Sequence, residues 1–191
     1  MITLISKLGM PKSLQKVSEM TGKSIKFFDV DICDKTSLRK VFSNNKIDCV
    51  LHIAALKSVS ESFESPLKYY SVNVAGSIHL VEVMEEFKVK KIVFSSSATV
   101  FGEPEYLPID EIHPTGKCIN PYGRTKYFFE EFLKDLNNSN KSGDDLVSKI
   151  LVFFCKIVIK LENCCHIIGY FRLGMLYVFA TLIQLELTPQ E

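Results

Sequence analysis

A tyrosine and a lysine near residue 120 are spaced so that they could share one chemical task. Tyr122 and Lys126 are four residues apart, which puts both on the same face of a helix. An ammonium group close to a phenol favours the phenolate and lowers its pKa from the usual value of about 10. A phenolate can take the proton of a sugar hydroxyl while hydride leaves the same carbon. The pair therefore predicts a base that acts in hydride-transfer chemistry.

The serine run Ser95–Ser97 lies about 25 residues before this pair and directly follows the apolar segment Ile92–Phe94. Serines at the carboxyl end of a parallel strand would lie where open α/β sheets bind their ligands. A hydroxyl at that place could bridge a substrate oxygen and the Tyr122 side chain. The Tyr-x-x-x-Lys spacing alone also fits a solvated lysine beside a half-buried tyrosine, and the serine run favours the catalytic interpretation.

Helix and strand signals alternate between residues 12 and 136. The order of these elements decides where the serine run, Tyr122 and Lys126 lie in the fold. Helices are expected where apolar residues recur every three to four positions, over residues 14–20, 35–42, 66–84 and 122–136. Short apolar runs predict strands over residues 25–31, 49–54 and 92–94. Such alternation predicts the α/β class and a parallel sheet with right-handed crossovers. Residues 150–159 fit either a strand or a helix.

Three local features carry further expectations. Asp34 has the short acidic side chain that suits the N-cap of the second helix. In the third helix, Tyr70, Val74 and Ile78 recur at four-residue spacing and predict its apolar face. His52 ends the strand over residues 49–54, and we expect it to be a packed core residue rather than a metal ligand.

The composition excludes several classes of protein. The 191 residues include 47% hydrophobic and 24% charged residues, which is typical of a globular chain and not of a disordered one. A net charge of +1 leaves no electrostatic footprint for nucleic acid or an anionic membrane. The six cysteines form no Cys-x-x-Cys pair and no zinc-ligand spacing, so we expect no metal site and a reducing, cytoplasmic location.

The C-terminal part differs from the rest of the chain. Residues 150–187 are strongly apolar, but their stretches without charge fall short of the roughly 18–20 residues that a membrane helix needs. We therefore expect no membrane span, and membrane association of this tail stays a minor alternative.

Five segments carry a resemblance to a known family. In chain order they are Leu51-His52-Ile53-Ala54-Ala55-Leu56-Lys57, Tyr69-Tyr70-Ser71-Val72-Asn73-Val74, Phe94-Ser95-Ser96-Ser97-Ala98-Thr99-Val100-Phe101-Gly102, His113-Pro114-Thr115-Gly116 and Asn120-Pro121-Tyr122-Gly123-Arg124-Thr125-Lys126. Together they closely resemble the UDP-glucose 4-epimerases of animal type, which are extended short-chain dehydrogenases/reductases. The resemblance covers about residues 11–141.

This resemblance implies roles for individual residues. Tyr122 resembles the catalytic base, and Lys126 resembles its partner, which also holds the nicotinamide ribose. Ser97 resembles the serine that hydrogen-bonds the sugar 4-oxygen, and Ala98 and Thr99 complete the implied substrate contacts. The implied NAD-binding residues are Ser97, Tyr122 and Lys126 together with Asp31, Ile32, Ile53, Ala54, Lys57 and Asn73. Asn73 looks like a structural asparagine of the superfamily, although a surface amide on a helix would also fit.

The activity implied by the resemblance is the interconversion of UDP-glucose and UDP-galactose through a 4-keto intermediate, with NAD as cofactor and a UDP-hexose as substrate. The resemblance also implies a homodimer, because helices of this region build a dimer in the family. The related sugar-nucleotide 4,6-dehydratases carry an Asp-Glu pair where this chain has Ser97-Ala98-Thr99. Without that acid the elimination of water would lack its proton donor, so epimerisation is favoured.

The chain also departs from this family at both ends. The family begins with a strand, a Gly-x-x-Gly-x-x-Gly turn and a helix, but only Gly9 and Gly22 precede residue 76 here. We therefore expect a partial Rossmann-like, doubly wound parallel sheet with helices on both faces, lacking the first βαβ unit and its glycine turn. The expected domain covers residues 1–141, and residues 142–191 are expected to be a divergent apolar tail. Such a truncated chain could be inactive, and a non-catalytic fragment that pairs with an epimerase subunit is the alternative.

Overall fold

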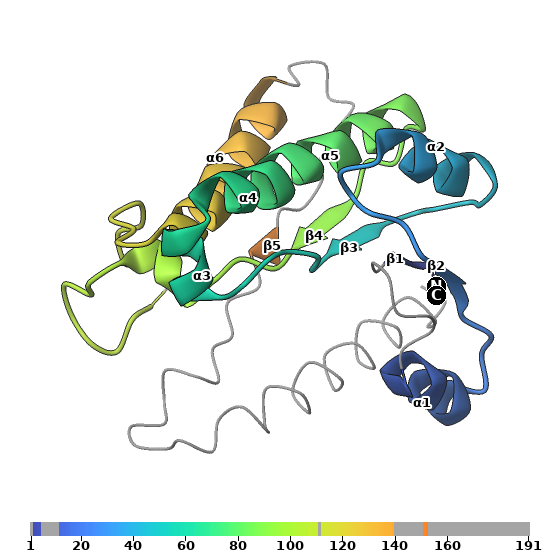
Figure 1. Cartoon of the computed structure of the whole chain (residues 1–191), viewed down its shortest axis with the longest axis horizontal. Helices are drawn as coiled ribbons and strands as arrows, with labels where there is room; N and C mark the ends of the chain where they lie inside the picture. The colour runs from blue at the N-terminus through green and yellow to red at the C-terminus, as the bar shows by residue number, and fades with distance from the viewer. Residues whose placement is uncertain (1, 5–11, 111, 140–150, 153–191) are drawn as a thin grey trace, which may run out of the picture. The chain divides into compact units, whose positions relative to one another are not determined.

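The strands of the chain pair in parallel throughout the part that is described (Figure 1). The computed structural model describes residues 2–4, 12–110, 112–139 and 151–152. Strand β1 (Ile2–Leu4) pairs with β2 (Lys26–Phe28), and β3 (Val50–His52), β4 (Ile92–Phe94) and β5 (Leu151–Val152) form a second sheet in that order. Parallel strands alternating with helices confirm the predicted α/β class.

The N-terminal part corrects one expectation. Strand β1 precedes helix α1 (Lys12–Thr21), and its residue Ile2 lies opposite Lys26 of β2. A strand–helix–strand unit therefore does open the chain, and the expectation that a first strand is absent is wrong. Residues 5–11, where a phosphate-binding turn would lie, are outside the described residues, so the lack of a glycine turn stays a prediction from the sequence.

The predicted start of the second helix is confirmed. Helix α2 covers Lys35–Ser43, and Asp34 is its N-cap, with Oδ1 accepting a hydrogen bond from the Ser37 backbone N–H at 3.1 Å. This bond satisfies one of the backbone N–H groups that the first turn of a helix leaves without a partner.

The third expected helix is interrupted in its middle. Helix α4 (Pro66–Tyr70) continues through a π-helical segment, η1 (Ser71–Gly76), into α5 (Ser77–Glu86). The predicted apolar face is wrong in the first half, where Tyr70 is exposed and Tyr69 is fully buried. The wider π turn changes which side chains face inward, and the buried face here includes polar Asn73 and Ser77.

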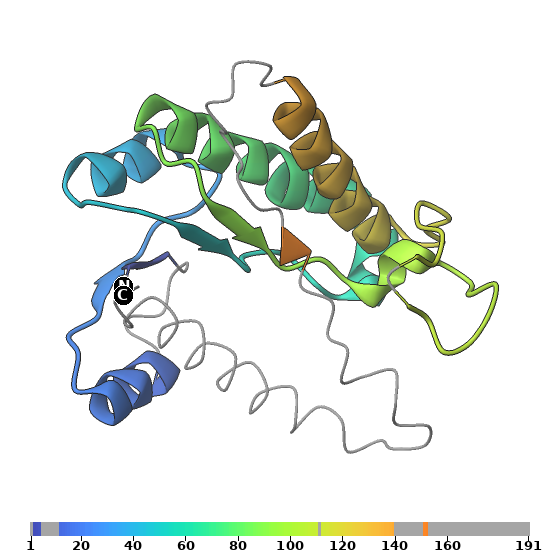
Figure 2. The ribbon, with the colours of Figure 1, turned by 180° about the vertical axis from the view of Figure 1, so that it is seen from behind.

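The core lies between one face of the β3-β4-β5 sheet and the helices α5 and α6 (Pro121–Ser139), as Figure 2 shows from behind. Its buried members are Leu38, Phe42, Leu80, Val81, Val83, Met84, Val89, Ile92, Phe94, Phe129 and Leu133. This packing holds the end of β4 against the first turns of α6. The second layer of helices, on the opposite face of the sheet, stays a prediction.

Strand β5 lies beyond the expected domain boundary at residue 141. It pairs with β4, with Leu151 opposite Val93, so the strand alternative for this region holds at residues 151–152. The remainder of the predicted tail, 142–150 and 153–191, lies outside the described residues. Among those described, no helix is long and apolar enough to cross a membrane.

Candidate active site

The Ser97 and Tyr122 side chains meet where β4 ends and α6 begins. Ser97 is the N-cap of the short 3-10 helix η2 (Ala98–Phe101), and its Oγ accepts hydrogen bonds from the Thr99 backbone N–H at 3.3 Å and the Thr99 hydroxyl at 2.9 Å. The Ser97 side chain also lies near enough to Tyr122 to influence the pKa of its phenol. Ser97, Thr99 and Tyr122 thus bring three hydroxyl groups to this end of the strand. Ala98 is exposed beside them.

Gly123 allows this close approach of helix and turn. A Cβ atom at residue 123 would lie 2.8 Å from the backbone oxygen of Thr99 and 3.0 Å from its Oγ1. The Gly123 backbone N–H donates to Asn120 Oδ1 at 2.7 Å, which anchors the first turn of α6. The helix can therefore present Tyr122 beside Ser97 only because residue 123 has no side chain.

The electrostatics of Tyr122 differ from the expectation. Burial raises the pKa of the Tyr122 phenol, and the hydrogen bond with Ser97 counteracts only part of that rise. The predicted lowering of the phenol pKa by Lys126 is wrong, because the lysine ammonium lies against the strand instead. Burial destabilises the phenolate form by more than the neighbouring Ser97 hydroxyl stabilises it.

Lys126 is buried one helical turn beyond Tyr122, with 4% of the residue exposed. Its Nζ donates a hydrogen bond to the Ser95 backbone oxygen at 2.8 Å and lies 4.7 Å from the centre of the Phe94 ring. Loss of solvation lowers the pKa of Lys126 to about 8, although the charge of Glu130 acts in the opposite direction. Its protonation state can therefore change close to neutral pH.

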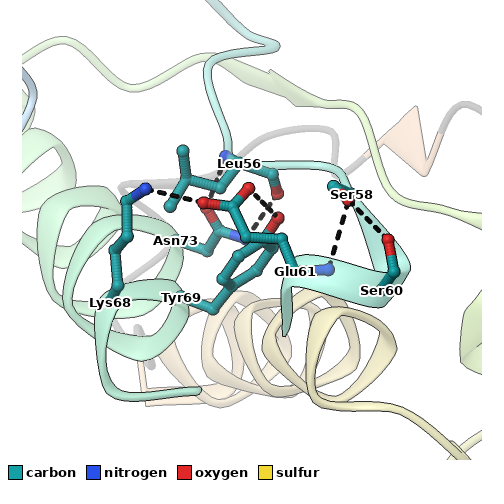
Figure 3. Close-up of polar contacts among 7 residues, drawn as sticks. All are labelled: Leu56, Ser58, Ser60, Glu61, Lys68, Tyr69 and Asn73. Carbon is teal, nitrogen blue, oxygen red and sulfur yellow. Dashed lines mark hydrogen bonds and ion pairs between the residues drawn. The ribbon is translucent and has the colours of Figure 1, made fainter. Parts of the chain in front are cut away.

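Asn73 fixes the loop that follows β3, as Figure 3 shows. Its Oδ1 accepts from the Leu56 backbone N–H at 2.8 Å, and its Nδ2 donates to the Leu56 oxygen at 2.9 Å and to Thr125 Oγ1 at 3.1 Å. The interpretation of Asn73 as a surface amide is thus excluded, because the residue is buried. The clamped loop carries half-buried Ile53 and Ala54 and ends at exposed Lys57.

A second cluster in Figure 3 anchors the same loop from its other end. Ser58 caps helix α3 (Val59–Glu64) by accepting from the Glu61 backbone N–H at 3.3 Å. The Glu61 carboxylate accepts from Lys68 Nζ at 2.7 Å and from the Tyr69 hydroxyl at 3.1 Å, and these bonds lower the pKa of Glu61. Helices α3 and α4 are thereby joined, and Lys57 extends from a loop that is held on both sides.

Asp31 and Ile32 lie in the turn after β2, and that turn contacts the helix that carries Asn73. Asp31 is exposed and its Oδ1 accepts from the Cys33 backbone N–H at 2.9 Å. Ile32 is buried against Gly76, where a Cβ atom would lie only 2.9 Å from Ile32 Cγ1. The π-helical segment therefore positions Ile32, and Asp31 precedes it in the same turn.

His52 is a core residue, as predicted. Its Nε2 lies 2.7 Å from Ser77 Oγ, which donates its own proton to the Asn73 backbone oxygen at 2.6 Å, so His52 acts as the donor. Its ring contacts those of Phe94 and Phe129. Burial lowers the pKa of His52 to about 3, with a smaller contribution from the Lys126 charge. In the described part of the chain, no group of His, Cys, Asp or Glu could hold a metal ion.

Sequence reasoning missed three residues that structure this site. Glu130 is buried and accepts a hydrogen bond from Ser96, and Thr125 is fully buried beneath Asn73. Glu130 repeats the four-residue spacing of Tyr122 and Lys126, which is a signal that could have revealed it. For Ser96 and Thr125, no pattern in the sequence distinguishes them from their neighbours.

Comparison with known proteins identifies similar sequences and structures. A family model described as GDP-mannose 4,6 dehydratase matches residues 5–150. UDP-glucose 4-epimerase of Bos taurus is 50% identical over 133 residues, which are 70% of this chain and 38% of the relative. The enzyme of that name from Drosophila melanogaster is 54% identical over 132 residues, which are 69% of this chain and 38% of the relative.

A solved structure is similar over the same region. The crystal structure of UDP-glucose 4-epimerase from Bifidobacterium longum, in complex with NAD+ and UDP, matches with a TM-score of 0.69 and 43% sequence identity. The match covers 73% of this chain and 42% of that one. The chain thus spans 38% of the length of the first curated relatives that it matches.

Proposed function

The chain belongs to the GDP-mannose 4,6-dehydratase family, and within it we propose that this polypeptide carries the catalytic residues of a UDP-glucose 4-epimerase. The proposed substrate is a UDP-hexose and the proposed cofactor is NAD. The observation that carries the proposal is the placement of Ser97 near Tyr122, with Lys126 one turn further along α6 and hydrogen-bonded to the Ser95 backbone oxygen. The proposed reaction inverts C4 of the sugar and so interconverts UDP-glucose and UDP-galactose.

The described residues fit a dinucleotide at the carboxyl ends of the parallel strands, where open α/β sheets bind such ligands. Exposed Asp31 follows β2, exposed Lys57 follows β3 on a clamped loop, and Ser97 follows β4. Asp31 and Ile32 would contact the adenine end, Lys57 would supply positive charge, and Lys126 would contact the nicotinamide ribose. When bound, NAD would accept and return a hydride.

Tyr122 would take the proton of the sugar 4-hydroxyl and later return it on completion of the inversion. Ser97 would orient that hydroxyl, since its Oγ already lies between Thr99 and Tyr122. Lys126, whose pKa of about 8 leaves it largely protonated at neutral pH, would supply positive charge one turn from Tyr122. Ala98 and Thr99 would line the sugar-binding side of the turn.

The turn after β4 supports epimerisation over dehydration. Elimination of water needs a proton donor near the leaving hydroxyl, and the segment Ser97-Ala98-Thr99 contains no acid. Glu130, the carboxyl group nearest in the described contacts, is buried and hydrogen-bonded to Ser96 on the strand side.

The exposed apolar side chains of helices α3, α4 and α6 support a homodimer as part of the proposal. They are Phe63, Leu67, Tyr70 and Phe128, and the three helices contact one another. The same face supports a second candidate function, in which a non-catalytic chain pairs with an epimerase subunit. A cytoplasmic location is also proposed, because the six cysteines of the sequence form no Cys-x-x-Cys pair.

The test measures conversion of UDP-galactose to UDP-glucose by the chain with NAD in excess. The turnover that the chain supports should fall by about 10²–10⁴-fold in Tyr122→Phe, because the proton acceptor is lost. Tyr70→Phe, which alters an exposed tyrosine on α4, is the matched control and should keep its activity. Equal turnover in the chain and in Tyr122→Phe would contradict the proposed base, and no turnover at all would favour the pairing function.

A further inference from the structure

Helix α6 carries a buried carboxyl group one turn beyond Lys126 that the proposed reaction does not use. Glu130 is only 3% exposed and accepts a hydrogen bond from the Ser96 hydroxyl. Its neighbour Glu131 differs, since it is partly exposed and pairs with Lys134 at 2.6 Å. Carboxylates are rarely buried unless they are paired, so the place of Glu130 needs a physical reason.

Three consecutive serines at the end of β4 each contact a different turn of α6. The contacts are Ser97 with Tyr122, the Ser95 backbone oxygen with Lys126 Nζ, and the Ser96 hydroxyl with Glu130 Oε1. The helix residues are spaced by four, so they form one row along a single helix face. A slip of the helix by one turn along the strand would break all three contacts. The contact of Glu130 therefore helps to hold Tyr122 beside Ser97.

Glu130 also acts on the charge of Lys126. Burial disfavours the ammonium, and His52 on β3 adds no competing positive charge because burial keeps its ring neutral. The charge of Glu130 raises the pKa of Lys126. Burial raises the pKa of Glu130 itself, and the hydrogen bond with Ser96 and the charges of Lys134 and Lys126 offset part of that rise. The other titratable groups that act on Glu130 are Lys134, Glu131 and Cys118.

We infer that Glu130 is a positioning residue of this site, which registers α6 on the end of β4 through Ser96 and places a carboxyl group one helical turn from Lys126. This inference rests on the proposed function, because that function is what makes the positions of Tyr122 and Lys126 important. The contacts of Glu130 themselves do not depend on catalysis, so they can be tested without it.

The test follows the titration of Lys126 in the full chain by the NMR signal of its ¹³C-labelled ε carbon, assigned from its loss in Lys126→Arg. We expect a midpoint near the Lys126 pKa of about 8 in the unaltered chain. In Glu130→Gln the midpoint should move to lower pH by about half a unit or more, because the attraction to a carboxylate is lost. Glu130→Asp, which keeps the charge, should restore part of that shift.

Glu131→Gln is the matched control, because it removes a neighbouring carboxylate from the same helix and should leave the midpoint of Lys126 unchanged. A second measurement needs no substitution: the Lys126 signal of the unaltered chain should show a further inflection where Glu130 takes up its proton. Equal Lys126 midpoints in Glu130→Gln and Glu131→Gln would overturn the inference. If Glu130→Gln does not fold, the unaltered chain decides, and the absence of the further inflection from its Lys126 signal would overturn the inference. An inactive chain with the expected titration would instead contradict the proposed function alone.

Discussion

The distance between the first turn of α6 and the turn after β4 is set by a residue without a side chain. Gly123 faces the backbone oxygen of Thr99, so even a methyl group at this position would displace one of the two segments. The neighbouring Tyr122 and Ser97 depend on that approach to lie near each other. Gly123, which takes no part in the proposed reaction, therefore positions two residues that do.

Substitution Gly123→Ala tests this requirement for close approach. We expect a loss of about 1–3 kcal/mol in the free energy of unfolding, because a Cβ 2.8 Å from a backbone oxygen forces a shift of the main chain. The higher helix propensity of alanine returns at most about 1 kcal/mol. Urea unfolding measures the difference, with Arg124→Ala at the adjacent exposed position as the control. Unchanged or increased stability of Gly123→Ala would show that the turn can move freely.

At the scale of the elements, the π-helical segment η1 links two parts of the site. It orients Asn73 toward Leu56 and Thr125, and it receives Ile32 against Gly76. Strand β3 is joined to the same helix through the His52–Ser77 contact. The contacts of this one segment thus reach the turn after β2, the loop after β3 and helix α6.

The buried His52 makes this junction sensitive to acid. Its pKa is lowered to about 3 in the folded chain against 6.5 when unfolded, so between these values the unfolded state binds a proton that the folded state does not. Stability is therefore lost as the pH falls below about 6.5, by at most about 1.4 kcal/mol per pH unit from this one group.

Urea unfolding between pH 5 and pH 7 measures that slope, above the range in which most carboxylates titrate. The variant His52→Gln should lose the contribution, since an amide does not titrate, and its stability should depend less on pH. The two proteins differ only at residue 52, so the difference between the two slopes isolates His52. Identical slopes would mean that the His52 ring takes up its proton in the folded chain as easily as in water.

At the scale of the whole molecule, the exposed apolar side chains of α3, α4 and α6 are the feature that the fold leaves unexplained. Leu67 is 80% exposed and Phe128 is 55% exposed. Apolar side chains gathered on one face typically mark an interaction surface. A specific dimer buries about 1,200–2,000 Å² in total, and several large side chains on neighbouring helices suit such an interface.

We expect the chain to form a dimer in sedimentation velocity measurements at micromolar concentration. Leu67→Glu should weaken the dimer by at least about tenfold, because a charge would be buried without a partner. The matched control is Met20→Glu, which alters an equally exposed apolar residue on α1. A monomeric chain, or equal dissociation in both variants, would contradict the proposed interface.

Local features of the sequence determined much of this protein. Residues within a few positions of one another determine four features that the structure also has. They are the limits of β4, the N-cap Asp34, the helix α6 and the one-turn spacing of Tyr122 and Lys126. The buried, unreactive character of His52 also follows from its apolar strand. Such features can be predicted from the sequence because hydrophobic periodicity and helix capping depend on residues within a single turn.

Only the tertiary structure decided the rest, since it depends on residues that are distant in sequence. The hydrogen bond of Ser96 with Glu130 joins residues 34 positions apart, and that of Asn73 with Thr125 joins residues 52 apart. The raised pKa of Tyr122 likewise results from burial beneath other segments, which the spacing to Lys126 did not reveal. Which side chains lose water, and which polar groups replace it, is set by how helices and strands pack and not by the order of residues within any one of them.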